Sequence, residues 1–223
     1  GFYEFFCFAE QIGAEPLPVV SCGLACQFQN DKTAHCSMEE LQTYIDDALD
    51  LIEFANGDPT TTWGKVRTEM GHPEPFNLKY LGIGNEQWGE EFIVRFEPFL
   101  QAVREKHPEI QVVGTSGPSA SGERFDYLWQ EMRRLGVDLV DEHYYAPETF
   151  FTENADRYDK YPRTGPKVPR CKWQEVQPLQ RLAARGRLYD RPGAQCRHRA
   201  HGHLCTTAGP RRGVAMATQP DLV

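Results

Sequence analysis

Hydrophobic residues recur at helical spacing in two segments of the N-terminal part of the chain, with a short apolar run between them. Residues 2–12 place large apolar side chains on one broad face and stop at Gly13, which predicts a helix and its end. The apolar run at residues 16–21 predicts a short buried strand. After a loop, an S-x-x-E capping box opens the next apolar periodic segment, which predicts a helix over residues 37–55.

The alternation of helical and strand patterns continues beyond this helix. Residues 63–75 are rich in glycine and proline and predict an irregular connection to a buried strand that ends near Gly84. In the helix predicted next, Pro98 should produce a kink or a break. The elements predicted in this part of the chain are that helix at 90–107, a strand at 110–114, a helix at 123–135 and a strand at 138–145.

A strict strand–helix alternation is typical of a parallel α/β barrel or of a doubly wound sheet. Neither a G-x-G-x-x-G motif nor a P-loop occurs at any predicted strand-to-helix turn, so the sequence gives no support for nucleotide binding. Residues whose side chains could act in catalysis or binding instead follow the C-terminal ends of successive predicted strands, as in a (β/α)8 barrel. The fold class that we predict is therefore α/β.

The segment KYLGIGNEQWG, residues 79–89, joins a buried strand to a group of polar and aromatic side chains. Two glycines leave space above the strand end, and Asn85, Glu86 and Trp88 follow directly. An amide, a carboxyl and an indole provide a hydrogen-bonding group, a proton donor and a stacking face, which are the requirements of a sugar site. A strand-to-helix turn with a polar cap is the alternative interpretation of the same residues.

The GNEQWG motif after a hydrophobic strand, with a later DEHYY, resembles the α-L-arabinofuranosidases of glycoside hydrolase family 51, in the clan of (β/α)8 retaining glycosidases. The resemblance extends over residues 1–167. It implies an incomplete barrel, about strands three to six with their helices, and hydrolysis of terminal α-L-arabinofuranosyl groups of arabinan- or arabinoxylan-type saccharides without a cofactor. Another glycosidase of the clan, of xylosidase or endoglucanase type, is the enzyme alternative.

The resemblance also implies roles for individual residues. Glu86 corresponds to the general acid/base, and Asn85 would hydrogen-bond the sugar hydroxyl beside the reacting carbon. His143 and Tyr145 would line the subsite, and alternation along a strand puts them on the same side. Trp88 could stack on a sugar ring, although core packing is an equally common use of such a residue.

A retaining glycosidase needs two carboxyl groups, a proton donor and a nucleophile. We expect the pKa of Glu86 to be raised by partial burial and by the second carboxylate. The family's nucleophile ends the seventh strand, shortly after a segment resembling residues 165–168, but no Gly-Glu follows here. Asp141 and Glu142 lie on the sixth strand; Glu142 should face the strand–helix layer and is assigned no catalytic role. The nucleophile is therefore absent from this chain, and we expect little or no hydrolase activity from it.

Charge divides the chain into two parts. Residues 163–223 hold 12 of the 24 Lys and Arg but 3 of the 32 Asp and Glu, a net charge of +9, and the rest of the chain carries −17. The tail is rich in Arg, Pro and Gly and lacks Ile and Phe, so it has few of the residues that build a core. We therefore expect a partial glycosidase barrel at 1–162 and a basic tail at 163–223 that is out of frame or disordered.

Two nonenzymatic interpretations of the tail compete with this one. A basic segment can bind nucleic acid nonspecifically, but no recognised motif or aromatic platform accompanies the charge, and we predict no nucleic-acid partner. Zinc is the other alternative, but the cysteines lack the C-x2-4-C spacing that usually accompanies H-x3-5-H, so we predict no metal site. The potential zinc ligands are Cys196, His198, His201, His203 and Cys205.

Several broad classes are excluded or left open by the remaining features. Seven cysteines without a repeating spacing predict free thiols rather than a disulfide framework. No apolar run approaches the ~20 residues that a membrane span requires, so we predict a soluble protein without a membrane partner. The N-terminal segment does not have the form of a signal peptide, and Gly1 suggests a truncated start, so the compartment stays open. Oligomerisation is an expectation for the full-length family member alone.

Overall fold

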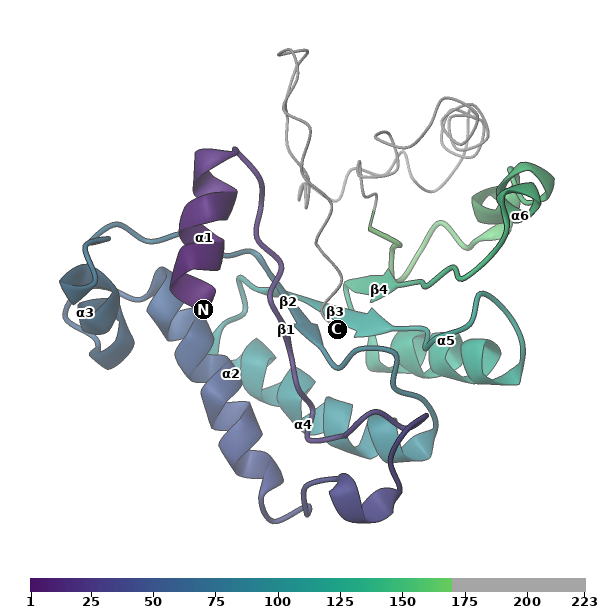
Figure 1. Ribbon diagram of the computed structural model, residues 1–223, viewed down its shortest axis with the longest axis horizontal. Coiled ribbons are helices and arrows are strands. Elements are labelled where there is room, and N and C mark those ends of the chain that lie inside the picture. Colours follow the sequence, from purple (N-terminus) through teal and green to yellow (C-terminus); the bar gives the residue numbers. More distant parts are fainter. Residues whose placement is uncertain (170–223) are drawn as a thin grey trace, which may run out of the picture.

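The computed structural model describes residues 1–169 as a parallel sheet with helices packed along it (Figure 1). The tail from residue 170 onward, with the cluster of potential zinc ligands, lies outside the described residues. The elements are α1 (Phe2–Gln11), β1 (Val19–Val20), η1 (Lys32–Ala34), α2 (Leu41–Asn56), α3 (Thr62–Glu69), β2 (Tyr80–Ile83), α4 (Glu90–Lys106), β3 (Gln111–Thr115), α5 (Glu123–Leu135), β4 (Leu139–Asp141), α6 (Glu148–Glu153) and η2 (Arg157–Lys160).

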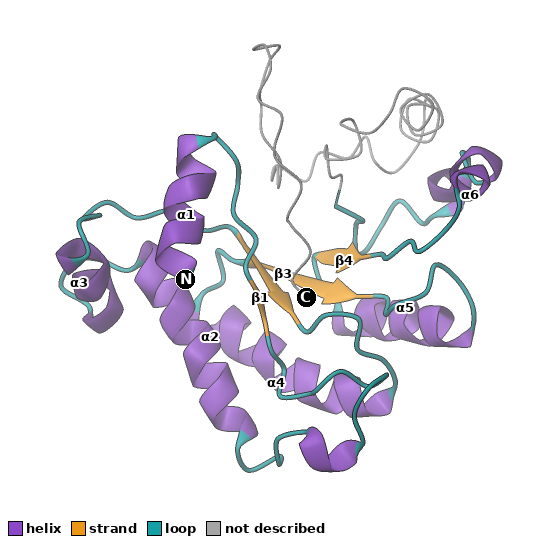
Figure 2. Cartoon of the chain, in the orientation of Figure 1, coloured by secondary structure: helices purple, strands orange, loops and turns teal. Residues whose placement is uncertain are grey.

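The four strands lie in the order β1-β2-β3-β4, and every neighbouring pair is parallel (Figure 2). Helices connect successive strands, as parallel pairing requires. The carboxyl ends of the strands therefore meet at one edge of the sheet, so the residues that follow β2 and β4 are brought to the same end of the fold. The α/β class predicted from the alternating pattern is confirmed.

The sheet buries apolar side chains on both faces. A large core fills the layer between the sheet and the helices, and its fully buried members include Leu81, Val112 and Val140. A second cluster on the strands contains Tyr80, Val113 and Leu139, with Leu17 packed against it. Burial on both faces explains why the strands read as continuous apolar runs rather than as alternating patterns.

The predicted capping box forms in the turn that directly precedes α2. The Ser37 amide donates to Oε2 of Glu40 at 3.0 Å, and the Glu40 amide donates to Oγ of Ser37 at 3.2 Å. Regular helix begins at Leu41 and ends at Asn56, beside Gly57. The reciprocal bonds satisfy amides that the first turn cannot pair internally.

Helix α3 corrects the prediction of an irregular connection over residues 63–75. Thr61 caps the helix by accepting a hydrogen bond from the Gly64 amide at 3.2 Å. The buried Arg67 holds it in place, because its guanidinium donates to the carbonyl oxygens of Phe54 and Gly57, both at 2.8 Å. Tertiary hydrogen bonds thus stabilise a helix whose own apolar pattern is weak.

Two further boundaries differ from the prediction. Helix α4 runs unbroken through Pro98, because the hydrogen bond that proline removes would go to the carbonyl of Val94, a residue exposed to solvent. Strand β4 ends at Asp141 rather than at residue 145.

On the side of β4 that does not pair with β3, the strand pairs with Lys167, whose amide donates to the Asp138 carbonyl at 3.0 Å. The sheet contacts thus reach past residue 162.

Within residues 1–169, no helix is both long enough and apolar enough to cross a membrane.

Candidate active site

Strand β2 delivers the GNEQWG segment to the carboxyl edge of the sheet. Gly84, at the end of the strand, has φ +75°, and a Cβ there would lie 2.8 Å from the Phe92 ring and 3.3 Å from Sγ of Cys22. A residue other than glycine would therefore meet both a strained backbone and a steric clash. The close packing fixes the direction in which the next two residues, Asn85 and Glu86, leave the sheet.

Glu86 lies where β2 and the segment after β4 meet. Its Oε1 accepts a hydrogen bond from the Tyr145 hydroxyl at 2.5 Å and lies 2.6 Å from Nδ1 of His143. The Glu86 side chain is 21% exposed and that of His143 is 19% exposed, so the pair is partly withdrawn from solvent while remaining reachable. The backbone of Glu86 is left-handed, with φ +58°, which few residues other than glycine adopt.

The contacts set the charge state of this carboxyl. Burial favours its neutral form, but the hydrogen bonds from Tyr145 and His143, together with the charge of His143, outweigh burial and hold the pKa of Glu86 below its ordinary value. The expectation of a raised pKa is therefore wrong for the described residues, because both donors stabilise the ionised form. The hydrogen bond to Glu86 raises the pKa of Tyr145, which keeps that hydroxyl protonated.

His143 contacts a second carboxylate that the sequence analysis did not place in the site. Its Nε2 lies 2.7 Å from Oδ2 of Asp141. This hydrogen bond is the largest of the contacts that raise the pKa of His143 to about 9, followed by the charge of Asp141 and by the contact with Glu86, while burial acts in the opposite direction. The i, i+2 alternation that pairs His143 with Tyr145 also includes Asp141, and this was the signal available in the sequence.

Glu142 faces the opposite side of the chain, as the same alternation predicts. Its side chain is fully buried in the layer between the sheet and α5, where Oε1 accepts from the Trp129 indole at 2.8 Å and from the Tyr161 hydroxyl at 2.5 Å. Arg157 Nε lies 3.4 Å from Oε2, and the Tyr144 hydroxyl also donates to that oxygen. The contacts of Glu142 thus lie within the protein interior and not in the cluster around Glu86.

Asn85 and Trp88 lie in different surroundings from that cluster. Asn85 is exposed beside Glu86, and its backbone N–H donates to Oε1 of Gln87. Trp88 lies in a surface group, where its ring centroid is 4.6 Å from that of Phe28 and its face lies 4.3 Å from the guanidinium carbon of Arg124. A sugar that stacked on this face of the indole would have to displace Arg124.

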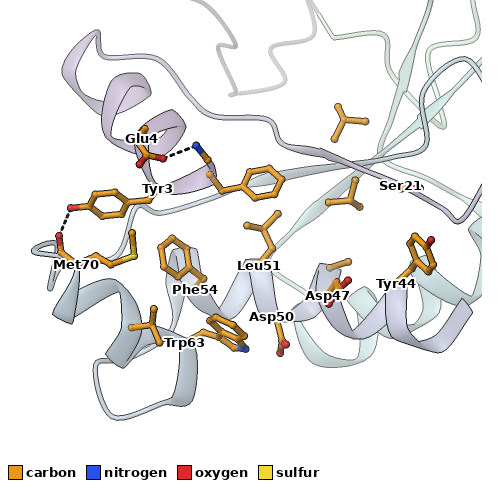
Figure 3. Close-up of a pocket in the computed structure, with 16 residues that line it drawn as sticks. Tyr3, Glu4, Ser21, Tyr44, Asp47, Asp50, Leu51, Phe54, Trp63 and Met70 are labelled. Atoms are coloured by element: carbon orange, nitrogen blue, oxygen red, sulfur yellow. Dashed lines mark hydrogen bonds and ion pairs between the residues drawn. The ribbon is translucent and has the colours of Figure 1, made fainter. Parts of the chain in front are cut away.

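A cavity of about 790 Å³ lies elsewhere, between α1, α2 and β1 (Figure 3). Its lining includes Phe2, Tyr3, Leu51 and Phe54, and the Tyr3 hydroxyl donates to the Met70 carbonyl at its rim at 2.8 Å. None of the residues in the Glu86 cluster lines it. The groove lies beside β1 and is mainly apolar, although Glu4, Asp47 and Asp50 also line it, so its chemistry differs from that of the candidate active site.

Among residues 1–169, no group of three or more His, Cys, Asp or Glu side chains is arranged to hold a metal ion.

Comparison with protein families supports the interpretation of the motif. The model of the alpha-L-arabinofuranosidase 1 domain matches residues 1–163. An extracellular exo-alpha-L-arabinofuranosidase of Streptomyces chartreusis is 49% identical over 169 residues, which cover 75% of this chain and 20% of that protein. Alpha-L-arabinofuranosidase 2 of Arabidopsis thaliana is 34% identical over 75% of this chain and 23% of its own length. The chain thus spans about a fifth of the length of these two curated relatives.

Solved structures show the same relationship. The arabinose-bound MgGH51 α-L-arabinofuranosidase matches with a TM-score of 0.60 and 28% identity, over 75% of this chain and 25% of that one. A family 51 α-L-arabinofuranosidase from Bifidobacterium longum matches in fold, with a TM-score of 0.55 and 20% identity over 72% of this chain and 33% of that one. The resemblance found in the sequence is confirmed: this chain belongs to the α-L-arabinofuranosidases of glycoside hydrolase family 51.

Proposed function

We propose that this chain contributes the acid/base part of a retaining glycosidase that removes terminal α-L-arabinofuranosyl groups, with Glu86 as the general acid/base. The observation that carries the proposal is the meeting of Glu86, His143 and Tyr145 at the carboxyl edge of the sheet, in a chain that belongs to this family. Carboxyl ends of parallel strands are where barrel enzymes collect catalytic groups.

In the proposed reaction, Glu86 protonates the glycosidic oxygen of the leaving group and later removes a proton from water. Asn85 contacts the sugar hydroxyl beside the reacting carbon, and His143 and Tyr145 line the subsite around Glu86. Between the two steps the sugar is held on a second carboxylate, which is assigned to no residue of this chain. The negative charge of that carboxylate would raise the pKa of Glu86 and load it with the proton that it donates.

The architecture that fits this role is an incomplete (β/α)8 barrel, with β1, β2, β3 and β4 as strands three to six. Side chains buried on both faces of the sheet, and the pairing of Lys167 with the outer edge of β4, support it. Residues 1–162 would then form the barrel segment, and the described residues after it extend the sheet contacts to Lys167. Because Lys167 pairs in parallel with Leu139 of β4, the residues around Lys167 lie where a seventh strand would lie.

Family membership and the arabinose-bound relative support a proposal for the substrate class. We propose arabinofuranosides of arabinan or arabinoxylan type, with Trp88 as a stacking group for a neighbouring sugar once Arg124 moves aside. Binding of the sugar uses hydrogen-bonding and stacking groups, and no cofactor is needed. Because the second carboxylate is unassigned, the isolated chain should release little or no arabinose.

A chimera tests the proposal. Residues 1–163 of this chain replace the matched segment of the Streptomyces relative, and the product is assayed on aryl α-L-arabinofuranoside and aryl β-xyloside. We expect arabinofuranoside hydrolysis that falls about 100-fold or more with Glu86→Gln and is unaffected by the control Glu105→Gln on the exposed side of α4. Equal activity of the Glu86→Gln variant, or a preference for the xyloside, would overturn it.

A further inference from the structure

The end of β4 and the segment that follows it carry two rows of side chains on opposite sides. Asp141, His143 and Tyr145 form one row, and the first and last of them are linked through contacts of His143 and Glu86. Glu142 and Tyr144 form the other row and hydrogen-bond each other in the buried layer. Although regular strand ends at Asp141, the alternation of a strand persists for four more residues.

The imidazole of His143 lies between two carboxylates. Nε2 lies 2.7 Å from Asp141 Oδ2 and Nδ1 lies 2.6 Å from Glu86 Oε1. An ionised carboxylate offers acceptors alone, so each ring nitrogen must carry a hydrogen for both contacts to be hydrogen bonds. The arrangement therefore selects the doubly protonated imidazolium over either neutral tautomer.

We propose that Asp141 is a positioning residue, which holds the His143 ring in the orientation and protonation state that direct its Nδ1–H to Oε1 of Glu86. This inference rests on the proposed function, because Glu86 is taken as the acid/base. Asp141 itself touches neither the sugar nor the transferred proton. It acts through the ring of His143, as an outer carboxylate orients a histidine in many sites.

The contacts also distinguish the two oxygens of Glu86. Within the described part of the chain, the hydrogen bonds from His143 and Tyr145 both arrive at Oε1. Oε1 is thus held by two donors, and Oε2 is the oxygen left to carry the proton to the glycosidic oxygen. With a neutral His143 the Nδ1–H donor would be lost in one tautomer, and the two oxygens would no longer differ in this way.

The backbone and the surroundings suit Asp141 to this role. The Ser116 amide and hydroxyl donate to the Asp141 carbonyl at 3.0 Å and 3.2 Å, which fixes the strand end on β3. The ionisable groups that face the His143 ring among residues 1–169 are Asp141, Glu86 and Tyr145. The contact with Asp141 is the main cause of the raised pKa of His143, about 9, even though the Asp141 side chain is 53% exposed.

An NMR titration of the full 223-residue chain tests the proposal without any measurement of hydrolysis. The ring nitrogens of ¹⁵N-labelled histidines are followed against pH, and His143→Gln assigns the resonance. In the unmodified chain His143 should be doubly protonated at neutral pH and titrate near pH 9. Asp141→Asn keeps an acceptor of the same size but removes the charge, and should lower the midpoint by about one unit or more.

Two further variants separate positioning from folding. Asp141→Glu restores a carboxylate and should recover most of the shift. Glu10→Gln removes a similar imidazole–carboxylate contact, 3.0 Å long at His72, and should leave His143 unchanged. An equal His143 midpoint in Asp141→Asn and in the unmodified chain, or a His143 that is neutral at pH 7, would overturn the inference. An inactive chimera would count against the proposed function while leaving this titration readable.

Discussion

The indole N–H of Trp129 on α5 donates to Oε1 of Glu142 across 2.8 Å, in the layer that separates α5 from the sheet. The carboxylate there also accepts from tyrosine hydroxyls of the segment that follows α6, and Arg157 lies beside it. Burial, followed by the charge of Glu142, raises the pKa of both Tyr144 and Tyr161, so these hydroxyls stay protonated and can donate. One carboxylate thus fastens the segment after β4 to the helix before it.

Glu142→Gln should destabilise the chain, because it removes the charge opposite the largely buried guanidinium of Arg157 and replaces one acceptor oxygen with an NH2 donor. Breaking such a buried pair costs about 3 kcal/mol in the free energy of unfolding. Urea unfolding followed by far-UV circular dichroism measures the change. Glu105→Gln on the exposed side of α4 is the control, and an equal effect of both substitutions would contradict the prediction.

Arg67→Lys should also destabilise the fold. The Arg67 guanidinium donates to the carbonyl oxygens of four residues, at distances of 2.8 to 3.1 Å, and a single ammonium cannot reach them all. Leaving buried carbonyls unpaired should cost about 2 kcal/mol or more. Lys65→Arg, an exposed change of the reverse kind on the same helix, should be neutral in the same unfolding measurement.

The stability contributed by the His143 cluster should depend on pH. The pKa of His143 is raised from 6.5 to about 9, so its contribution is complete below about pH 6.5 and is lost as the pH rises through 9. The pKa of Glu86 is lowered, so its contribution is lost in acid, as the pH falls through that lowered value. The stability difference between the unmodified chain and His143→Gln should shrink by on the order of 2 kcal/mol between about pH 6 and about pH 10. A stability difference between the two proteins that stays constant over this pH range would refute the prediction.

The groove beside β1 should bind an apolar dye. Exposed aromatic and aliphatic side chains line it, and contiguous apolar surface of this kind takes up anilinonaphthalene sulfonate. Phe2→Ser, at the groove, should lower the dye fluorescence about two-fold or more in proportion to the apolar surface lost. Phe8→Ser changes an equally exposed residue of α1 that does not line the groove, and should have little effect.

The elements that the sequence predicts well are those whose own pattern is strong. Helix α5 is predicted with its observed bounds, because a wide apolar stripe ends at Gly136, which has the left-handed backbone of a helix cap. Helix α3 is missed because its eight residues include Gly64 and present few apolar side chains. Helix α3 is stabilised by hydrogen bonds between Arg67 and carbonyl groups distant in sequence, and a local sequence pattern cannot predict these bonds.

The residues of the candidate site also include some that a local pattern predicts and some that it does not. Alternation along one strand is enough to place His143 and Tyr145 together and to turn Glu142 away from them. The contact between His143 and Glu86 joins residues 57 positions apart and depends on the pairing of strands, which the family resemblance implies and local sequence does not. The sign of the Glu86 pKa shift was predicted wrongly, because two donors on one oxygen outweigh burial, and such a balance is visible only in three dimensions.

The left-handed backbone of Glu86 has a consequence for selection. A side chain at φ +58° stores about 1 kcal/mol that glycine would release. Glycine at this position would release the strain, but it would also lose the hydrogen bonds that the Glu86 carboxyl accepts from His143 and Tyr145. The two effects oppose each other, so selection for thermal resistance alone should act only weakly on Glu86, and strict retention of glutamate would report a selection that acts on the carboxyl itself.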